Sequence, residues 1–241
     1  MIGLGTIINS AAIVLGGAAG ALAGRRFGRE MQDALKTACG ISTLFIAVAG
    51  AMEGMLTVEG GSLAGGRSLL VVLCLTLGTL AGELMGIERG FERLGEWLKS
   101  KTGSADDANF VDAFVTASLT VCIGAMAIVG AIQDGLTGNI ATLAVKSVLD
   151  FIIIAVMTSS MGRGCVFSAV PVFFFEGGVT LLARLISPVM TPSAISSLSL
   201  IGSVLIFCVG INLVWNKSIR VANMLPAVLF AVLAAYLPWG L

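Results

Sequence analysis

The 241-residue chain has no histidine, one tyrosine and little charge, with Asp, Glu, Lys and Arg making up 12% of its residues. The absence of histidine removes the commonest general base and the ligand on which most zinc, copper and haem sites depend. Basic and acidic residues number 14 each, so the chain has no basic surface for a nucleic acid. The motifs GxxxxGK[ST], HExxH and GxSxG are also absent, which argues against an ATP motor and against the common hydrolases. We therefore expect no enzyme, no cofactor and no metal site.

Hydrophobic residues, in contrast, make up 57% of the chain, and the mean hydropathy is +1.01. Soluble domains are about 45–50% apolar and about 25% charged, so this composition is that of a membrane protein. A helix that spans a bilayer needs about 20 mostly apolar residues. Eight stretches meet that requirement: 2–24, 38–57, 67–87, 109–133, 140–161, 164–186, 195–215 and 220–240. We expect an all-α polytopic membrane protein with one integral membrane domain over residues 1–241; a division into halves 1–137 and 138–241 is the alternative.

The positions of Lys and Arg predict how the eight stretches cross the membrane, because cytoplasmic loops are enriched in these residues. At the outer side, where the second, fourth and sixth stretches end, the only basic residues are Arg67 and Arg184. Eleven basic residues lie in the alternate connections: Arg25, Arg26, Arg29, Lys36, Arg89, Arg93, Lys99, Lys101, Arg163, Lys217 and Arg220. The count predicts a multi-pass membrane protein with both termini outside the cytoplasm.

Residues 88–101 have a different pattern, with apolar residues on one helical face and charges elsewhere. Phe91, Leu94, Trp97 and Leu98 form that face. The pattern predicts a short amphipathic helix on the cytoplasmic leaflet. Residues 25–36 show a weaker form of the same pattern, and we interpret both as interfacial anchors.

Internal similarity suggests tandem helical hairpins. The segments 51–57, 131–137 and 174–180 each place an acid or amide before glycine, an apolar residue and threonine. Such units would be parallel repeats, and transporters often place their sites at repeat interfaces; composition alone is the alternative explanation. Gly16, Gly20 and Gly24 form a GxxxGxxxG stripe, which indicates a close helix contact rather than a ligand site. The contact can be internal or between protomers, and we expect a homo-oligomer through such glycine-rich faces.

Several strings spread over the whole chain resemble one family. They are GTIINSAAIVLGGAAG near the start, FVTASLTVCIGAMAIVGAIQDGL, LAVKSVLDF, MGRGCVFSAV and IGSVLIFCVGINLVWNKSIRVANMLPA. Together they are similar to the YqgA/YdfK-type bacterial inner-membrane proteins, a family of unknown function. The resemblance implies a bacterial multi-pass membrane protein and supplies no activity. Glu176 departs from the family pattern, in which glutamine is common, so a carboxylate there is not required across the family.

Ionisable residues inside the predicted spans are the candidates for function, because each costs about 2.5–3.5 kcal/mol to insert at a helix centre. Asp150 and Glu176 lie near the middle of their stretches, and Lys146 lies four residues before Asp150, on the same helix face. The alternative is that Lys146 and Asp150 form an ion pair with a purely structural role. Pro171 and Gly177-Gly178 surround Glu176, which predicts either a broken helix at the carboxylate or a simple kink. The remaining candidates are the mid-span Asn9 and, near span ends, Asn212, Asn223 and Glu53.

These residues favour a secondary transporter or ion-coupled carrier of a small solute or ion, with H+ or Na+ as possible coupling ions. Lys146, Asp150, Glu176 and Asn9 would line a polar cavity near the midplane. A channel is a variant of this hypothesis, and a non-transporting membrane scaffold or accessory subunit is the rival class. The predicted partners are the lipid bilayer and the small solute, and no nucleic acid.

Overall fold

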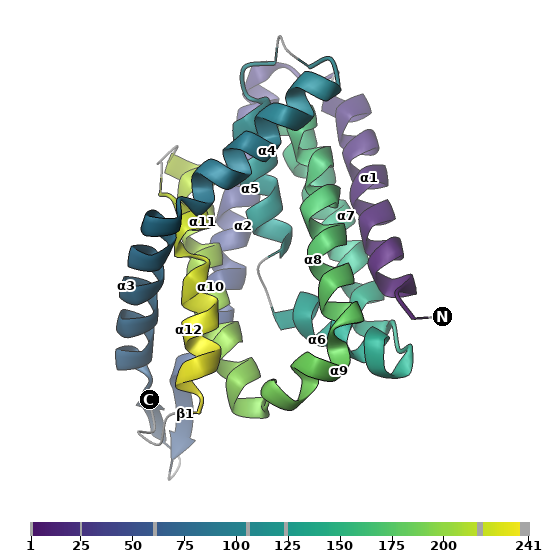
Figure 1. Cartoon of the computed structure of the whole chain (residues 1–241). Helices are drawn as coiled ribbons and strands as arrows, with labels where there is room; N and C mark the ends of the chain where they lie inside the picture. Colours follow the sequence, from purple (N-terminus) through teal and green to yellow (C-terminus); the bar gives the residue numbers. More distant parts are fainter. Residues whose placement is uncertain are drawn as a thin grey trace.

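The computed structural model describes residues 2–24, 26–59, 62–104, 107–122, 125–215 and 219–236. Nearly all of these residues lie in helices (Figure 1). In chain order the helices are α1 (Leu4–Gly24), α2 (Arg29–Met55), α3 (Ser68–Met85), α4 (Ile87–Lys101), α5 (Phe110–Cys122), α6 (Ala125–Thr137), α7 (Ala141–Met161), α8 (Ala169–Leu181), α9 (Ala183–Ile186), α10 (Pro192–Trp215), α11 (Val221–Met224) and α12 (Pro226–Ala234). Short 3₁₀ turns, η1 (Arg163–Ser168) and η2 (Ser187–Val189), precede α8 and follow α9.

Helices lie in all eight stretches that the sequence predicts as spans. Within the described ranges, six are long and apolar enough to cross a membrane: α1, α2, α3, α7, the η1–α8 segment and α10. The pair α5 and α6 makes a seventh if it counts as one span, and it is bent by 61° at its break. The α11–α12 segment is apolar but shorter. A polytopic helical membrane protein is therefore confirmed, whereas eight spans stay a prediction.

Close helix contacts join segments that are far apart in the sequence. α1 packs along α7, α2 along α10, and α3 along α12. A Cβ added at Gly16 would lie 2.4 Å from the Phe151 carbonyl oxygen, and one at Gly20 would lie 2.2 Å from that of Ala155. The glycine stripe of α1 therefore makes an internal contact with α7, in which both helices run in the same direction. Because the closest pairs are not consecutive in sequence, the structure gives no support to tandem hairpin units.

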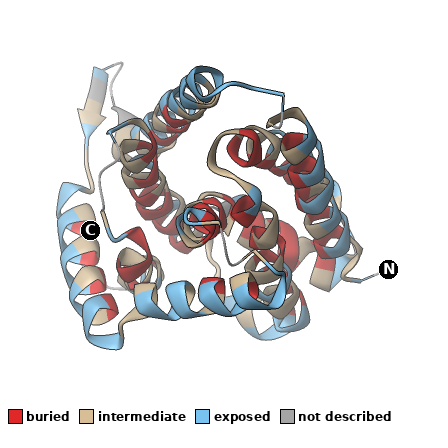
Figure 2. Cartoon of the chain, turned by 90° about the horizontal axis from the view of Figure 1, so that it is seen from above, coloured by how far each residue is buried: buried red, intermediate tan, exposed pale blue. Residues whose placement is uncertain are grey.

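Buried residues lie on the helix faces that point into the bundle, and exposed residues lie on the outer faces (Figure 2). Many of the exposed residues are large and apolar. Phe45 on α2 is 73% exposed and Phe174 on α8 is 72% exposed. Large apolar side chains at such exposure suit a surface covered by lipid rather than by water.

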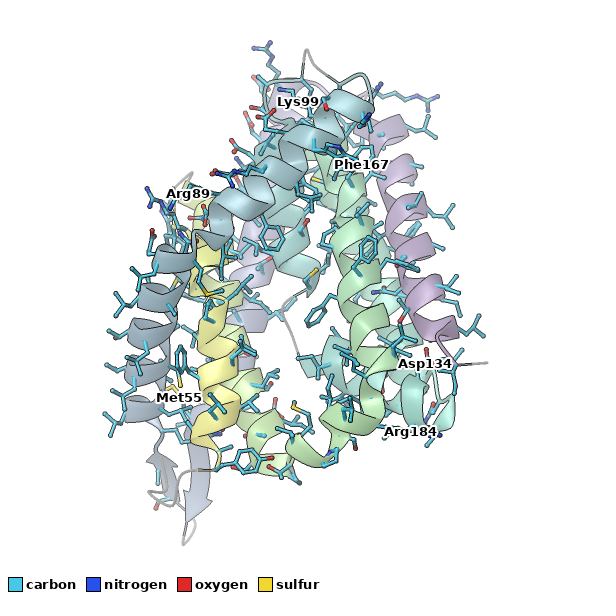
Figure 3. The ribbon with its side chains drawn as sticks, in the orientation of Figure 1. Met55, Arg89, Lys99, Asp134, Phe167 and Arg184 are labelled. Carbon is cyan, nitrogen blue, oxygen red and sulfur yellow. The ribbon has the colours of Figure 1, made fainter. Side chains whose placement is uncertain are left out.

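The two ends of the bundle differ in charge. Arg89 and Lys99 lie at the end that α4 covers, and Arg184 lies at the opposite end (Figure 3). α1 begins and α12 ends at the Arg184 end (Figure 1). The charge count predicts most basic residues at one end of the bundle and both chain ends at the other, and this placement agrees with that prediction. Arg25 and Lys217, which belong to the count, lie outside the described residues. Which end faces the cytoplasm stays a prediction.

The amphipathic segment is helical, as predicted, but much of its apolar face packs against the protein. Leu98 is buried against Phe110 and Phe114 of α5, while Trp97 is 56% exposed. The second predicted anchor, residues 25–36, is not a separate element, because α2 begins at Arg29 and runs through it. Arg25 lies outside the described residues.

Two features differ from the sequence prediction: a hairpin after α2 and the course of α8 at Glu176. Residues after α2 form an antiparallel hairpin of β1 (Leu56–Glu59) and β2 (Ser62–Gly65), in which Leu56 pairs with Gly65. The Gly60-Gly61 sequence between the strands is a usual hairpin signal. Of the two alternatives predicted at Glu176, a broken helix and a simple kink, the broken helix is wrong, because α8 continues through Gly177-Gly178 to Leu181. Pro171 lies in the first turn of α8, where its missing N–H costs no helical hydrogen bond.

Candidate functional site

Four of the predicted site residues meet in the interior of the bundle. Lys146 and Asp150 lie on α7, Asn9 on α1 and Glu176 on α8, and each side chain is buried. The Lys146 ammonium pairs with Asp150 Oδ2 and lies 3.5 Å from Glu176 Oε1. Asn9 Nδ2 donates to Asp150 Oδ2 at 3.1 Å and to Glu176 Oε1 at 2.9 Å. We call these four residues the central cluster. The parallel packing of α1 on α7 positions Asn9 between the two carboxylates.

Lys146 also reaches the break between α5 and α6. Its Nζ donates to the Val121 carbonyl oxygen at 2.8 Å. Val121 is in the last turn of α5, where the carbonyls have no partner further along the helix. The negative end of the α5 dipole and two carboxylates therefore surround one ammonium group. Lys146 links three helices in this way, and the bend between α5 and α6 exposes the carbonyl that it binds.

The hydrogen-bonding capacity of the central cluster is not filled. Within the described part of the chain, Glu176 Oε2 and Asn9 Oδ1 are buried and accept no hydrogen bond. Buried acceptors normally have donors, because burying a polar atom without a hydrogen bond costs free energy. One ammonium group also faces two carboxyl groups, so the cluster has a net charge of −1 when both are ionised. The cluster can therefore accept one further proton or small cation.

A separate polar cavity of about 330 Å³ opens beside α4. Glu88, Glu92 and Asp112 line it together with Lys36, Thr116, Asn212 and apolar residues that include Leu119 of α5. Burial and the neighbouring Glu92 raise the pKa of Glu88. Leu119 lies two residues before Val121, so this cavity and the central cluster lie against the same helix.

Three predicted site residues lie away from the central cluster. Asn212 exchanges hydrogen bonds with the backbone of Ile219, at 2.9 and 3.0 Å. Asn223 Oδ1 accepts from the Glu88 backbone N–H at 2.7 Å, in the first turn of α4. Both asparagines therefore hold loops and helix ends in place. Glu53 is exposed on α2 and takes no part in the hydrogen bonds of the cluster.

Asp134, in the last turn of α6, is fully buried. Its two carboxylate oxygens accept from the backbone N–H groups of Gly3 and Gly5, at 3.1 and 2.9 Å. Asp134 of α6 thus caps the start of α1 in place of a local residue. No group of three or more His, Cys, Asp or Glu residues suited to a metal occurs in the ranges that the structure describes.

The partners that sequence reasoning missed are backbone groups. No side-chain pattern marks the Val121 carbonyl as the third partner of Lys146. The glycine at position 124, inside an apolar run, is the one signal in the sequence for a break near that carbonyl.

Comparison with known proteins agrees with the resemblance of the strings. The family model described as "Protein of unknown function (DUF554)" matches residues 4–236. The chain is 28% identical over 242 residues to "Uncharacterized protein YqgA" of Escherichia coli (strain K12), with 98% of each chain covered. It is 24% identical over 225 residues to "Uncharacterized membrane protein YdfK" of Bacillus subtilis (strain 168), covering 93% of this chain and 92% of the relative. No solved structure matches.

Proposed function

The chain belongs to the DUF554 family of proteins of unknown function, and we propose that it is an ion-coupled secondary carrier whose coupling site is the central cluster. The observation that carries the proposal is Glu176, a buried carboxyl group with one unpartnered oxygen beside an ion pair that is already complete. Charged residues at membrane depth are expensive to insert and mark ion or proton pathways. The Glu176 carboxylate is a third charge at this depth, and a proton or cation that binds reversibly would neutralise it.

The roles of the two carboxylates differ. Asp150 is the primary partner of Lys146 and also accepts from Asn9, so its charge is compensated within the cluster. Glu176 shares Lys146 at a longer distance and leaves Oε2 free. A proton or cation therefore binds at Glu176 at the smallest electrostatic cost to the rest of the cluster. A glutamine at this position would leave Lys146 and Asp150 as a neutral pair, so ion coupling through the cluster is proposed only for chains with a carboxylate here.

The break between α5 and α6 supports a carrier in a second way. Transporter sites are typically built where spans are discontinuous and helix ends point at bound ions. Here the α5 end contacts Lys146 rather than an ion. Protonation of Glu176 would remove one of the two negative charges that compete for Lys146, and so would change the position of the ammonium group between Asp150 and the Val121 carbonyl. In this scheme the charge state of Glu176 controls how firmly α5 is held against α7 and α8.

Reconstitution into liposomes tests the proposal. We would measure H+ and Na+ movement under an imposed pH gradient for wild type and Glu176→Gln, with Glu53→Gln as a matched control. Glu53 is an exposed glutamate on α2, so the same chemical change is made outside the central cluster. We expect Glu176→Gln to reduce ion movement to the level of empty liposomes, while Glu53→Gln behaves as wild type.

The double variant Asp150→Asn with Lys146→Met removes the ion pair without leaving one charge alone. If wild type moves ions and neither this variant nor Glu176→Gln differs from it, the central cluster is structural. Rapid flux that shows no coupling to a second solute would identify a channel. If wild type moves no ion and no solute, the scaffold or accessory subunit gains support.

A further inference from the structure

A large apolar hollow lies apart from the central cluster. It has a volume of about 890 Å³ and lies between α8 and α12. Its walls include Phe91 of α4, Cys122 of α5, Phe175 and Val179 of α8, and Val232 of α12. Apart from Cys122 and Gly202, its lining consists of aliphatic, aromatic, methionine and proline residues. We call it the lateral groove.

The lateral groove is closed at both ends of the bundle and open at its side. α4 crosses one end of it, and α9 with η2 crosses the other (Figure 1). Several lining residues are exposed at the mouth between α8 and α12: Leu229 at 68%, Leu233 at 62% and Leu185 at 75%. An occupant therefore enters from the side, where a spanning bundle faces hydrocarbon rather than water.

An exposed arginine lies close in sequence to a lining residue at each end of the groove. Arg89 lies two residues after the lining residue Ile87 at the α4 end, and its guanidinium lies against Gly86. Arg184 precedes the lining residue Leu185 at the α9 end. Figure 3 places these two arginines at opposite ends of the bundle. An apolar groove with one arginine near each of its ends matches an acyl chain that continues into a phosphate headgroup, and basic residues at membrane interfaces attract such headgroups.

We propose that the lateral groove binds an acyl chain of a membrane phospholipid, whose phosphate contacts the arginine at one end. The site does not depend on ion coupling, because its lining contains no residue of the central cluster. The groove nevertheless lies beside the central cluster. Its lining residue Phe175 is adjacent in sequence to Glu176, and its lining residue Cys122 is adjacent to Val121, whose carbonyl binds Lys146. A bound chain therefore supports the region where α5 breaks.

Lipid retention tests the site. The protein would be purified in mild detergent, washed extensively and analysed by native mass spectrometry and by phosphate content. Val179→Trp with Val232→Trp fills the groove from both walls, and Val148→Trp is the matched control, since Val148 is 60% exposed on α7 and lies outside the groove. We expect wild type and Val148→Trp to retain stoichiometric phospholipid and the groove-filling variant to lose most of it. Equal retention by the groove-filling variant and the control overturns the proposal.

A second measurement uses the unmodified chain, so it does not depend on the folding of a variant. Wild type would be reconstituted with phosphatidylglycerol that carries a photoreactive group in its acyl chain, and the adducts would be mapped. Adducts on Phe175, Val179 or Val232 are expected. Adducts confined to outer positions such as Phe174, or cross-links that join the grooves of two copies, overturn the proposal, the latter by identifying a second copy as the occupant. Arg89→Gln and Arg184→Gln then show which end holds the phosphate, by which of the two lowers lipid retention.

Discussion

The contact between α1 and α7 should respond sharply to a single methyl group. A Cβ at Gly20 would lie 2.2 Å from the Ala155 carbonyl oxygen, whereas ordinary contacts begin near 3.4 Å. The obstacle is backbone, which cannot rotate away as a side chain can. Gly20→Ala therefore requires the two helices to separate locally by about 1 Å, and overpacking of this kind typically costs about 1–3 kcal/mol.

The helix itself gains from the same change, because alanine is favoured over glycine in a helix by up to about 1 kcal/mol. Gly178 on α8 isolates that gain, since a Cβ there meets no atom within 4 Å. We expect Gly178→Ala to be as stable as wild type or slightly more stable. Gly20→Ala should be less stable than Gly178→Ala by about 2 kcal/mol. Gly24→Ala should be milder than Gly20→Ala, because its Cβ would lie 2.8 Å from the Ser159 carbonyl oxygen.

The assay is unfolding in mixed micelles as the fraction of SDS rises, followed by circular dichroism. Separation of α1 from α7 should also lengthen the 3.1 Å bond between Asn9 and Asp150, so the proposed ion movement should fall together with stability. Equal stability of Gly20→Ala and Gly178→Ala would refute the close packing of α1 on α7. A loss at Gly24 larger than at Gly20 would refute the register of the two helices.

Two further predictions concern the ends of the bundle. Asp134→Ala removes both acceptors for Gly3 and Gly5, and we expect a loss of about 1–2 kcal/mol in the same unfolding assay; a variant as stable as wild type would mean that α1 needs no cap from α6. Glu88 has a raised pKa in the folded protein, from burial first and Glu92 second, so its contribution to folding is favourable at low pH and is lost as the pH rises through the raised value. Glu88→Gln should therefore match wild type in Tm at about pH 4 and exceed it at about pH 8, and a gain confined to acidic pH would contradict this sign.

The helical elements were predictable because each depends on local composition. The apolar stretch 140–161 became α7 (Ala141–Met161) almost without change, since its ends are marked by glycine and polar residues. The hairpin after α2 is not predicted, because the apolar stretch 38–57 continues past the end of the helix, whereas β1 begins at Leu56. The bend between α5 and α6 is not predicted, because the stretch 109–133 is mostly apolar and its composition does not show where a helix ends.

The central cluster was predictable in part for the same reason. Lys146 and Asp150 are four residues apart, so helix geometry alone pairs them. Asn9 and Glu176 were candidates only because they are polar at membrane depth. Their meeting depends on α1 packing against both α7 and α8. The α1–α7 contact depends in turn on glycines whose partners are backbone atoms more than 100 residues away. A single sequence does not specify such pairings, because in lipid no hydrophobic force selects one helix face over another, and close fit decides.

That dependence on fit has a consequence for the candidate site itself. The α1–α7 contact is held by backbone approach and tolerates little change, and the start of α5 is held in the same way, because a Cβ at Gly164 would lie 2.1 Å from the Phe110 carbonyl oxygen. The end of α5 is held by a different contact, the hydrogen bond from Lys146 to the Val121 carbonyl. In the proposed scheme, protonation of Glu176 changes the charge beside Lys146 and Asn9 and leaves the glycine contacts unchanged. Motion in this protein should then be sought at the end of α5 nearest Lys146, while α1, α7 and the start of α5 remain packed.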